Sequence, residues 1–91
     1  MLKITTQTGT RGIVFVLEGN LAGAWVPELE SCWHRVVTSD QPVRIMLKTV
    51  TFIDDRGKKL LVEMHRQGVK LMAEGCMTRA IVDEIVRGGR A

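Results

Sequence analysis

The 91-residue chain has few aromatic side chains, with no tyrosine, two phenylalanines and two tryptophans. Proteins that bind single-stranded nucleic acids commonly stack the bases on such side chains. The net charge of +3 would favour a nucleic acid, but the basic residues are interspersed with acidic ones. We therefore do not expect nucleic acid to be the partner of this protein.

Long hydrophobic runs are also missing from the sequence. No stretch approaches the roughly 20 apolar residues that span a bilayer, and the N-terminus lacks the pattern of a secretory signal. Hydrophobic residues make up 45% of the chain and charged residues 25%, which is ordinary for a soluble globular domain. We expect one cytoplasmic domain over residues 1–91, without membrane insertion.

The sequence has only two cysteines, Cys32 and Cys76. In a cytoplasmic protein we expect both to be reduced and buried, with a disulfide as the alternative. His34 is close to Cys32 but lacks the further ligands of a zinc site, and neither His34 nor His65 has a partner at a catalytic spacing. A phosphate-binding glycine motif of the Walker type is absent. The sequence therefore predicts no enzymatic activity, no metal and no cofactor.

The hydrophobic pattern predicts strands that alternate with helices. The predicted strands are residues 2–5, 13–17, 43–47 continuing to 53, and 69–73. Of the three predicted helices, the first begins near Trp25, the second runs from 55 to 67 with Gly68 as its C-cap, and the third follows the turn at 74–75. This β-β-α-β-α-β-α order predicts an α/β fold with a mostly parallel four-stranded sheet that starts with a hairpin and is flanked by helices on one face or both.

Two apolar segments carry further predictions about burial. Residues 13–17 are continuously apolar and β-branched, which predicts a central strand buried on both faces, followed by a connecting loop over 18–23. Trp25 and Trp33 are two helical turns apart and share a face. We expect both to pack in the core, although exposure of either would indicate an interface, because large aromatic side chains dominate binding hot spots.

The segment Val-Thr-Phe-Ile-Asp-Asp-Arg-Gly at 50–57 is the best candidate for a functional site. A buried strand runs here into two carboxylates and then into a helix N-terminus, where unpaired N–H groups and the helix dipole favour anions. One of the two, Asp54 in particular, is expected to cap the helix. Gly57 would allow a close backbone approach, or a positive φ.

Three stretches of the chain resemble those of the STAS domain, the fold of anti-sigma factor antagonists and of the cytoplasmic tails of sulfate transporters. They are the strand end Val-Leu-Glu-Gly-Asn-Leu at 16–21, the apolar strand with its loop at 43–54, and Asp-Arg-Gly at 55–57, which occupies the place of the family's Ser-Ser-Gly or Ser-Ala-Gly and is followed by a matching helix and Gly68. The similarity covers nearly the whole chain.

The resemblance implies a particular site and a particular departure from it. In bacterial antagonists of this family the residue after the loop aspartate is a serine or threonine, phosphorylated by a kinase that is itself the anti-sigma factor. Asp55 stands there in this chain and cannot accept phosphate by that route. Its single negative charge would mimic a phosphoserine imperfectly. Arg56 replaces a small residue, and Met46 stands where the family often has an acidic one.

The implied function is therefore non-enzymatic protein binding, as in an anti-sigma factor antagonist that docks on a kinase-type anti-sigma factor. The candidate partner-binding residues are Asp54, Asp55, Arg56, Gly57, Lys58 and Lys59, with Glu18 and Asn20 flanking Asp54 at the carboxyl edge of the sheet. The alternatives are an accessory subunit that docks on the ATPase subunit of an ABC transporter, and a component of a stressosome-like assembly. A homodimer is also expected, through an uncovered sheet edge or helix surface.

Overall fold

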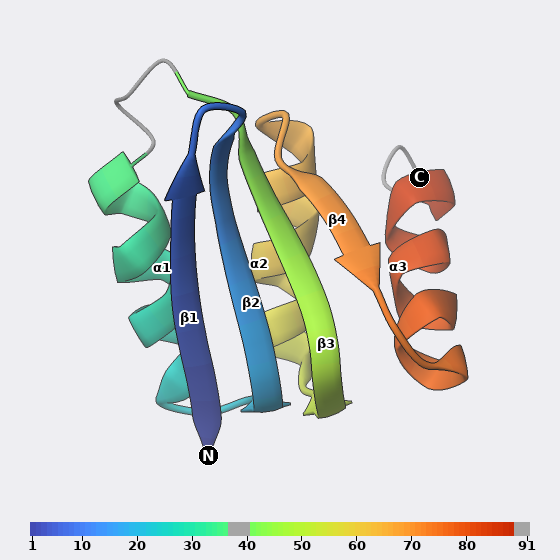
Figure 1. The fold of residues 1–91 in the computed structure, drawn as a ribbon. Helices are drawn as coiled ribbons and strands as arrows, with labels where there is room; N and C mark the ends of the chain where they lie inside the picture. The colour runs from blue at the N-terminus through green and yellow to red at the C-terminus, as the bar shows by residue number, and fades with distance from the viewer. Residues whose placement is uncertain (37–40, 89–91) are drawn as a thin grey trace.

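The computed structural model describes residues 1–36 and 41–88, except for the side chains of Cys76 and Met77. The elements follow in the order β1 (Leu2–Gly9), β2 (Gly12–Leu21), α1 (Trp25–Val36), β3 (Val43–Ile53), α2 (Asp55–Arg66), β4 (Lys70–Ala73) and α3 (Cys76–Gly88) (Figure 1). The predicted order of strands and helices is confirmed. The predicted burial of Cys76 lies outside the described side chains.

The four strands form one sheet in the order β1-β2-β3-β4. The hairpin of β1 and β2 is antiparallel, whereas β3 pairs with both β2 and β4 in parallel. Each parallel step needs a crossover connection, and α1 and α2 supply the two crossovers. The mostly parallel sheet expected from the sequence is therefore present.

Helices cover one face of this sheet, since α1 and α2 lie behind the strands in Figure 1 and α3 lies beside β4. Burial along β2 alternates accordingly: Ile13, Phe15 and Leu17 are buried, while Val14 and Val16 are only half-buried. The prediction that 13–17 is buried on both faces was wrong. An apolar run shows which residues favour a strand, but it does not show how many faces the helices will cover.

The hairpin strands are longer than the sequence pattern predicted. β1 extends to Gly9, and β2 extends to Leu21 through the segment expected to be a loop. The register explains this extension, because Leu2 pairs with Gly19 of β2 and Ile53 of β3 pairs with Leu21. Long-range backbone pairing thus keeps polar residues in a strand that local pattern assigns to a loop.

A glycine in the left-handed conformation ends α2. Gly68, with φ of +96°, follows α2, and the amides of Gly68 and Val69 donate to the carbonyls of His65 and Met64, as in a Schellman motif. The predicted glycine cap is confirmed.

Trp33 is buried, but Trp25 is 38% exposed, so only one of the two tryptophans packs in the core as expected. Cys32 is a free, half-buried cysteine.

Candidate functional site

Asp54 connects three segments at the carboxyl edge of the sheet. As the N-cap of α2, its Oδ1 accepts a hydrogen bond from the Gly57 amide at 2.7 Å, and its Oδ2 accepts one from the Gly23 amide at 2.9 Å. The Asp54 amide donates in turn to the carbonyl of Leu21 at 3.1 Å. The predicted capping role is confirmed, and the same carboxylate also fixes the connection between β2 and α1.

The hydrogen bond from Gly23, followed by that from Gly57, lowers the pKa of Asp54 below its ordinary value. Both donors favour the charged carboxylate. Because the pKa is lower in the folded than in the unfolded protein, protonation weakens the folded state. The stabilisation is fully present above the unfolded value of about 3.9 and is lost as the pH falls through the lower folded value.

The variant Asp54→Asn tests this linkage. The amide has one acceptor oxygen in place of two, so we expect it to keep one of the two backbone bonds and to melt several degrees below wild type at pH 7. As the pH falls from about 4 through the lower folded pKa of Asp54, the difference in melting temperature should shrink, because protonation removes the charge of the wild-type carboxylate. A difference that stays constant from neutral to acidic pH, measured by circular dichroism, would show that the charge of Asp54 contributes nothing.

Gly57 lies where the first turn of α2 meets the end of β2. A Cβ built on Gly57 would lie 2.6 Å from the carbonyl oxygen of Leu21, far inside van der Waals contact. The φ of Gly57 is not positive. Of the two reasons offered for a glycine at this position, close backbone approach is therefore the one that applies, and it holds α2 against the sheet.

The charged residues that follow have different surroundings. Asp55, Arg56 and Lys59 are exposed on the first turns of α2, whereas Lys58 is half-buried and forms an ion pair with Glu84 of α3. Lys58 thus joins α2 to α3 instead of lying free on the surface. The structure therefore presents one carboxylate and two cations of the 54–59 segment to solvent, on a scaffold that Asp54 and Gly57 hold in place.

Glu18 and Asn20 both lie in β2, and Asn20 is the nearer of the two to the end of the strand at Leu21. The Asn20 side-chain oxygen accepts a hydrogen bond from the Thr51 hydroxyl at 2.7 Å. Asn20 directly precedes Leu21, whose carbonyl accepts the hydrogen bond from the Asp54 amide. Asn20 therefore lies at the same sheet edge as Asp54. Glu18 lies within the strand, opposite Lys3 of β1. The two flanking residues expected from the sequence are thus placed differently, and only Asn20 reaches the edge.

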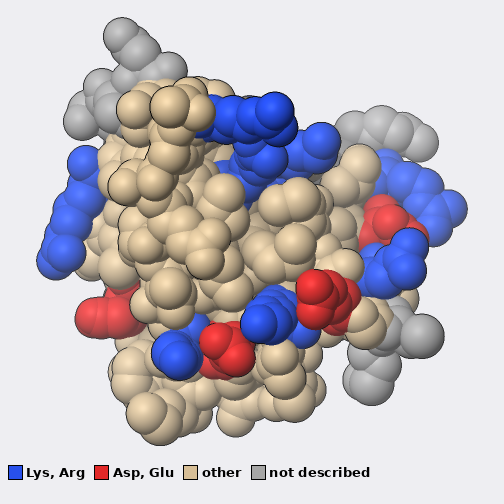
Figure 2. All heavy atoms as spheres, in the orientation of Figure 1, with Lys and Arg blue, Asp and Glu red and all other residues tan. Residues whose placement is uncertain are grey.

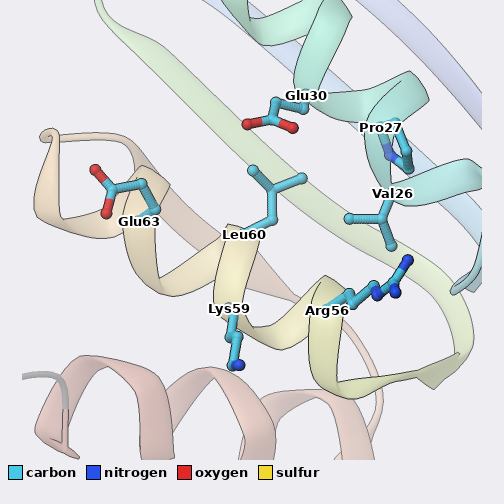
Figure 3. A pocket seen from close by; sticks show the side chains of 7 residues that line it. All are labelled: Val26, Pro27, Glu30, Arg56, Lys59, Leu60 and Glu63. Carbon is cyan, nitrogen blue, oxygen red and sulfur yellow. The ribbon is translucent and has the colours of Figure 1, made fainter.

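A shallow groove of about 360 Å³ runs beside this edge, between α1 and α2. Its walls are Val26, Pro27 and Glu30 of α1 and Arg56, Lys59, Leu60 and Glu63 of α2 (Figure 3). Arg56 extends toward Val26 and Pro27, while the two glutamates lie farther along the helices (Figure 3). The groove is therefore apolar at its centre, basic where α2 begins, and acidic at the other end.

Comparisons with known proteins agree with the architecture. The chain superposes on the crystal structure of an anti-sigma factor antagonist from Mycobacterium paratuberculosis with a TM-score of 0.78, at 20% sequence identity, covering 100% of this chain and 96% of that one. The chain has the fold of an anti-sigma factor antagonist. No protein-family model matches the sequence, and no curated protein matches it significantly. The STAS-like architecture expected from the sequence is confirmed.

The surface of this antagonist fold carries two apolar side chains near Asp54 that the sequence pattern did not identify as site residues. Phe52 is 55% exposed two positions before Asp54, and Trp25 is 38% exposed two positions after Gly23, the residue that donates to Asp54. Exposed aromatic side chains beside a rigid loop are typical anchors of protein interfaces. Alternation in β3 could not reveal Phe52, because the pairing with β2 shifts register just before it.

The part of the chain that the structure describes offers little to other classes of site. Among those residues, no group of three or more His, Cys, Asp and Glu side chains could hold a metal ion. None of the described helices is long and apolar enough to cross a membrane. The junction of β3 and α2, with Phe52 and Trp25 beside it, therefore remains the best-defined candidate site.

Proposed function

We propose that this chain is a protein-binding regulator of the anti-sigma factor antagonist type, and that the start of α2 docks on a kinase-type anti-sigma factor. The observation that supports this most is the presentation of Asp55. Asp54 and Gly57 fix the backbone on either side of it through the Gly23 amide and the Leu21 carbonyl. Its carboxylate is exposed at the first position of the helix, beside aromatic side chains that can be buried on binding.

The chemistry of docking is non-covalent in this proposal. Asp55 and Arg56 supply opposite charges that a complementary surface can pair, which gives orientation and association rate. Phe52 and Trp25 supply apolar area, which gives affinity. A partner that approaches this edge also meets the groove between α1 and α2, whose apolar centre can receive a side chain.

Asp55 makes the interaction independent of phosphorylation of this residue. A carboxylate carries about one negative charge, against roughly 1.5 to 2 for phosphoserine. Two states follow from this difference: the chain binds constitutively, or it resembles the phosphorylated state and binds weakly. The variant Asp55→Ser distinguishes the two states. If the serine is phosphorylated by the partner and the unphosphorylated variant binds more tightly than wild type, the wild-type chain resembles the phosphorylated state. If binding is unchanged, the wild-type chain binds constitutively.

The experiment that tests the proposed partner is co-purification of the tagged protein from its source cells. We expect wild type to recover a kinase-type anti-sigma factor and Asp55→Lys to recover at least tenfold less of it, because the reversed charge faces the partner. Asp54 is left intact, since its loss would disturb the fold itself. The matched control is Asp83→Lys, which makes the same charge change on an exposed position of α3 and should leave recovery unchanged.

Three other results would contradict the proposal. Recovery of transporter ATPase subunits would indicate an accessory subunit with the same fold. Recovery of a large assembly of related domains would indicate a stressosome-like component. Equal recovery of the anti-sigma factor by wild type and Asp55→Lys would place the docking surface elsewhere on the molecule.

A further inference from the structure

The face of the sheet that the helices leave uncovered carries an ordered arrangement of side chains. The register places Thr5, Val16, Met46 and Met72 side by side across the four strands; three of these residues are apolar, and we name the four the apolar row. All four are half-buried, while their neighbours on the helix-covered side, such as Leu17 and Leu47, have no exposed surface. The three parallel-paired strands β2, β3 and β4 therefore expose on this face half-buried apolar side chains that a partner could cover.

A second row of alternating charge lies beside the apolar row. Lys3 of β1 pairs with Glu18 of β2. Leu47 of β3 pairs with Ala73 of β4, and the next residue of each chain segment is charged, Lys48 after Leu47 and Glu74 after Ala73. The Glu74 amide donates a hydrogen bond to the Leu47 carbonyl. We name Lys3, Glu18, Lys48 and Glu74 the charged row. Figure 2 shows blue and red atoms alternating below a broad uncharged area, with further blue atoms above it. The register assigns Arg44 and Lys70, which are neighbours on β3 and β4, to the other side of the apolar row.

We propose that this face binds a second copy of the chain through a two-fold axis that runs parallel to the strands between β2 and β3. From β1 to β4 the charges of the charged row are positive, negative, positive and negative. When a second copy lies over the row with its strands in the reverse order, every charge therefore faces an opposite charge. The axis brings Lys3 opposite the partner's Glu74, and Glu18 opposite the partner's Lys48. A two-fold interface of this kind makes each contact twice.

The same axis also suits the other residues of the face. In the apolar row, Val16 meets the partner's Met46, and methionine adapts well to such contacts. Arg44 meets the partner's Val14, so the cations of the two copies do not face each other. A two-fold axis across the strands would instead bring Arg44 opposite the partner's Lys48, a like-charge contact that costs free energy, and Lys70 opposite the partner's Glu74, which only offsets that cost. Charge therefore selects one orientation of the two that symmetry allows.

The dimer is expected to be weak. Strands lie about 4.8 Å apart, so four strands some five residues long present roughly 300–400 Å², well below the roughly 800 Å² per partner of a standard interface. Packed sheets are about 10 Å apart, a gap that long lysine and glutamate side chains can span. Phe52 is in register with Asn20 at one end of this face, but Asp55 and Arg56 lie on α2, so sedimentation of the purified protein and co-purification test the dimer and the proposed anti-sigma factor docking separately.

Sedimentation of the purified protein from micromolar to millimolar concentration tests the proposal. We expect wild type to shift reversibly from monomer to dimer, and Glu18→Lys to need at least tenfold higher concentration, because the substituted lysine faces the partner's Lys48. The double variant Glu18→Lys/Lys48→Glu restores opposite charges across the axis and should restore dimerisation. Glu28→Lys, the same change at an exposed position of α1, is the matched control.

A mixture of the single variants Glu18→Lys and Lys48→Glu separates the interface from simple loss of folding. In each variant the contact between residues 18 and 48 of the same copy joins like charges, whereas both contacts between the two different copies join opposite charges, so we expect the mixture to dimerise more readily than either variant alone. A wild type that stays monomeric at millimolar concentration overturns the proposal. Dimerisation that is equal in wild type and Glu18→Lys, or that the double variant fails to restore, overturns it as well.

Discussion

The variant Gly57→Ala is expected to lower the free energy of unfolding by about 1–3 kcal/mol, the usual cost of forcing extra atoms into a packed site. Helix propensity alone predicts the opposite sign, because alanine is favoured over glycine in a helix by about 1 kcal/mol. The contact with the sheet decides the outcome. The new Cβ would lie 2.6 Å from the Leu21 carbonyl oxygen and close to side-chain atoms of Leu21 and Ile53, and the oxygen belongs to backbone that cannot rotate away.

Relief of this overlap requires α2 to move away from β2 at its first turn. That movement would stretch the hydrogen bond from the Gly57 amide to Asp54 and displace Asp55, the first residue of the helix. We therefore expect Gly57→Ala to reduce recovery of the partner together with stability. Urea denaturation followed by circular dichroism measures the first effect, and the co-purification assay measures the second.

Gly9 provides the matched control for this prediction. A Cβ on Gly9 has no atom of another segment within 4 Å, and its φ is not positive. The variant Gly9→Ala should therefore change the free energy of unfolding by no more than about 0.5 kcal/mol. If Gly57→Ala is as stable as wild type or more stable, helix propensity outweighs the contact, and the first turn of α2 can shift without cost.

The variant Phe52→Ala is expected to weaken binding of the partner at least 30-fold while leaving the fold intact. Truncation of a hot-spot aromatic residue costs about 2 kcal/mol or more in binding free energy, and about 1.4 kcal/mol corresponds to a factor of ten. Phe52 is 55% exposed, so its truncation removes little buried area from the folded monomer. Titration calorimetry with the recovered partner measures the dissociation constant.

Val86 provides the control for the Phe52 prediction. It is 48% exposed on α3, outside the β3–α2 junction, and Val86→Ala should leave the dissociation constant within about twofold, as expected for a residue away from the hot spot. Equal binding by wild type and Phe52→Ala would show that the exposed ring does not enter the interface. In that case Trp25 is the remaining large aromatic side chain beside Asp54, and Trp25→Ala becomes the next variant.

The order of elements and the role of the helix start could be predicted from the sequence because both depend on local chemistry. Apolar spacing distinguishes strands from helices, and an aspartate before a helix caps it whatever surrounds it. The Asp54–Gly57 hydrogen bond was therefore predictable. The second bond of Asp54, from Gly23 across 31 residues, was not, because it depends on how the β2–α1 connection folds back.

Burial was the property that local pattern predicted least well. Trp25 and Trp33 share a helix face by spacing, yet only Trp33 reaches the core, because Trp25 is the first residue of α1. Lys58 has the spacing of an outward residue, yet it forms an ion pair with Glu84, because α3 packs against α2. Neither outcome has a signal in the neighbouring residues, since each depends on where a distant element ends.

The sequence by itself thus determined the alternating strands and helices and the capped loop with Asp55 at its exposed first helical position. Those features follow from periodicity and from hydrogen bonding within a few residues. Only the tertiary structure decided which face of the sheet stays open, that Phe52 is exposed, and that Lys3, Glu18, Lys48 and Glu74 fall in one row. Those features depend on strand register and helix placement, which are set by contacts between residues far apart in the chain.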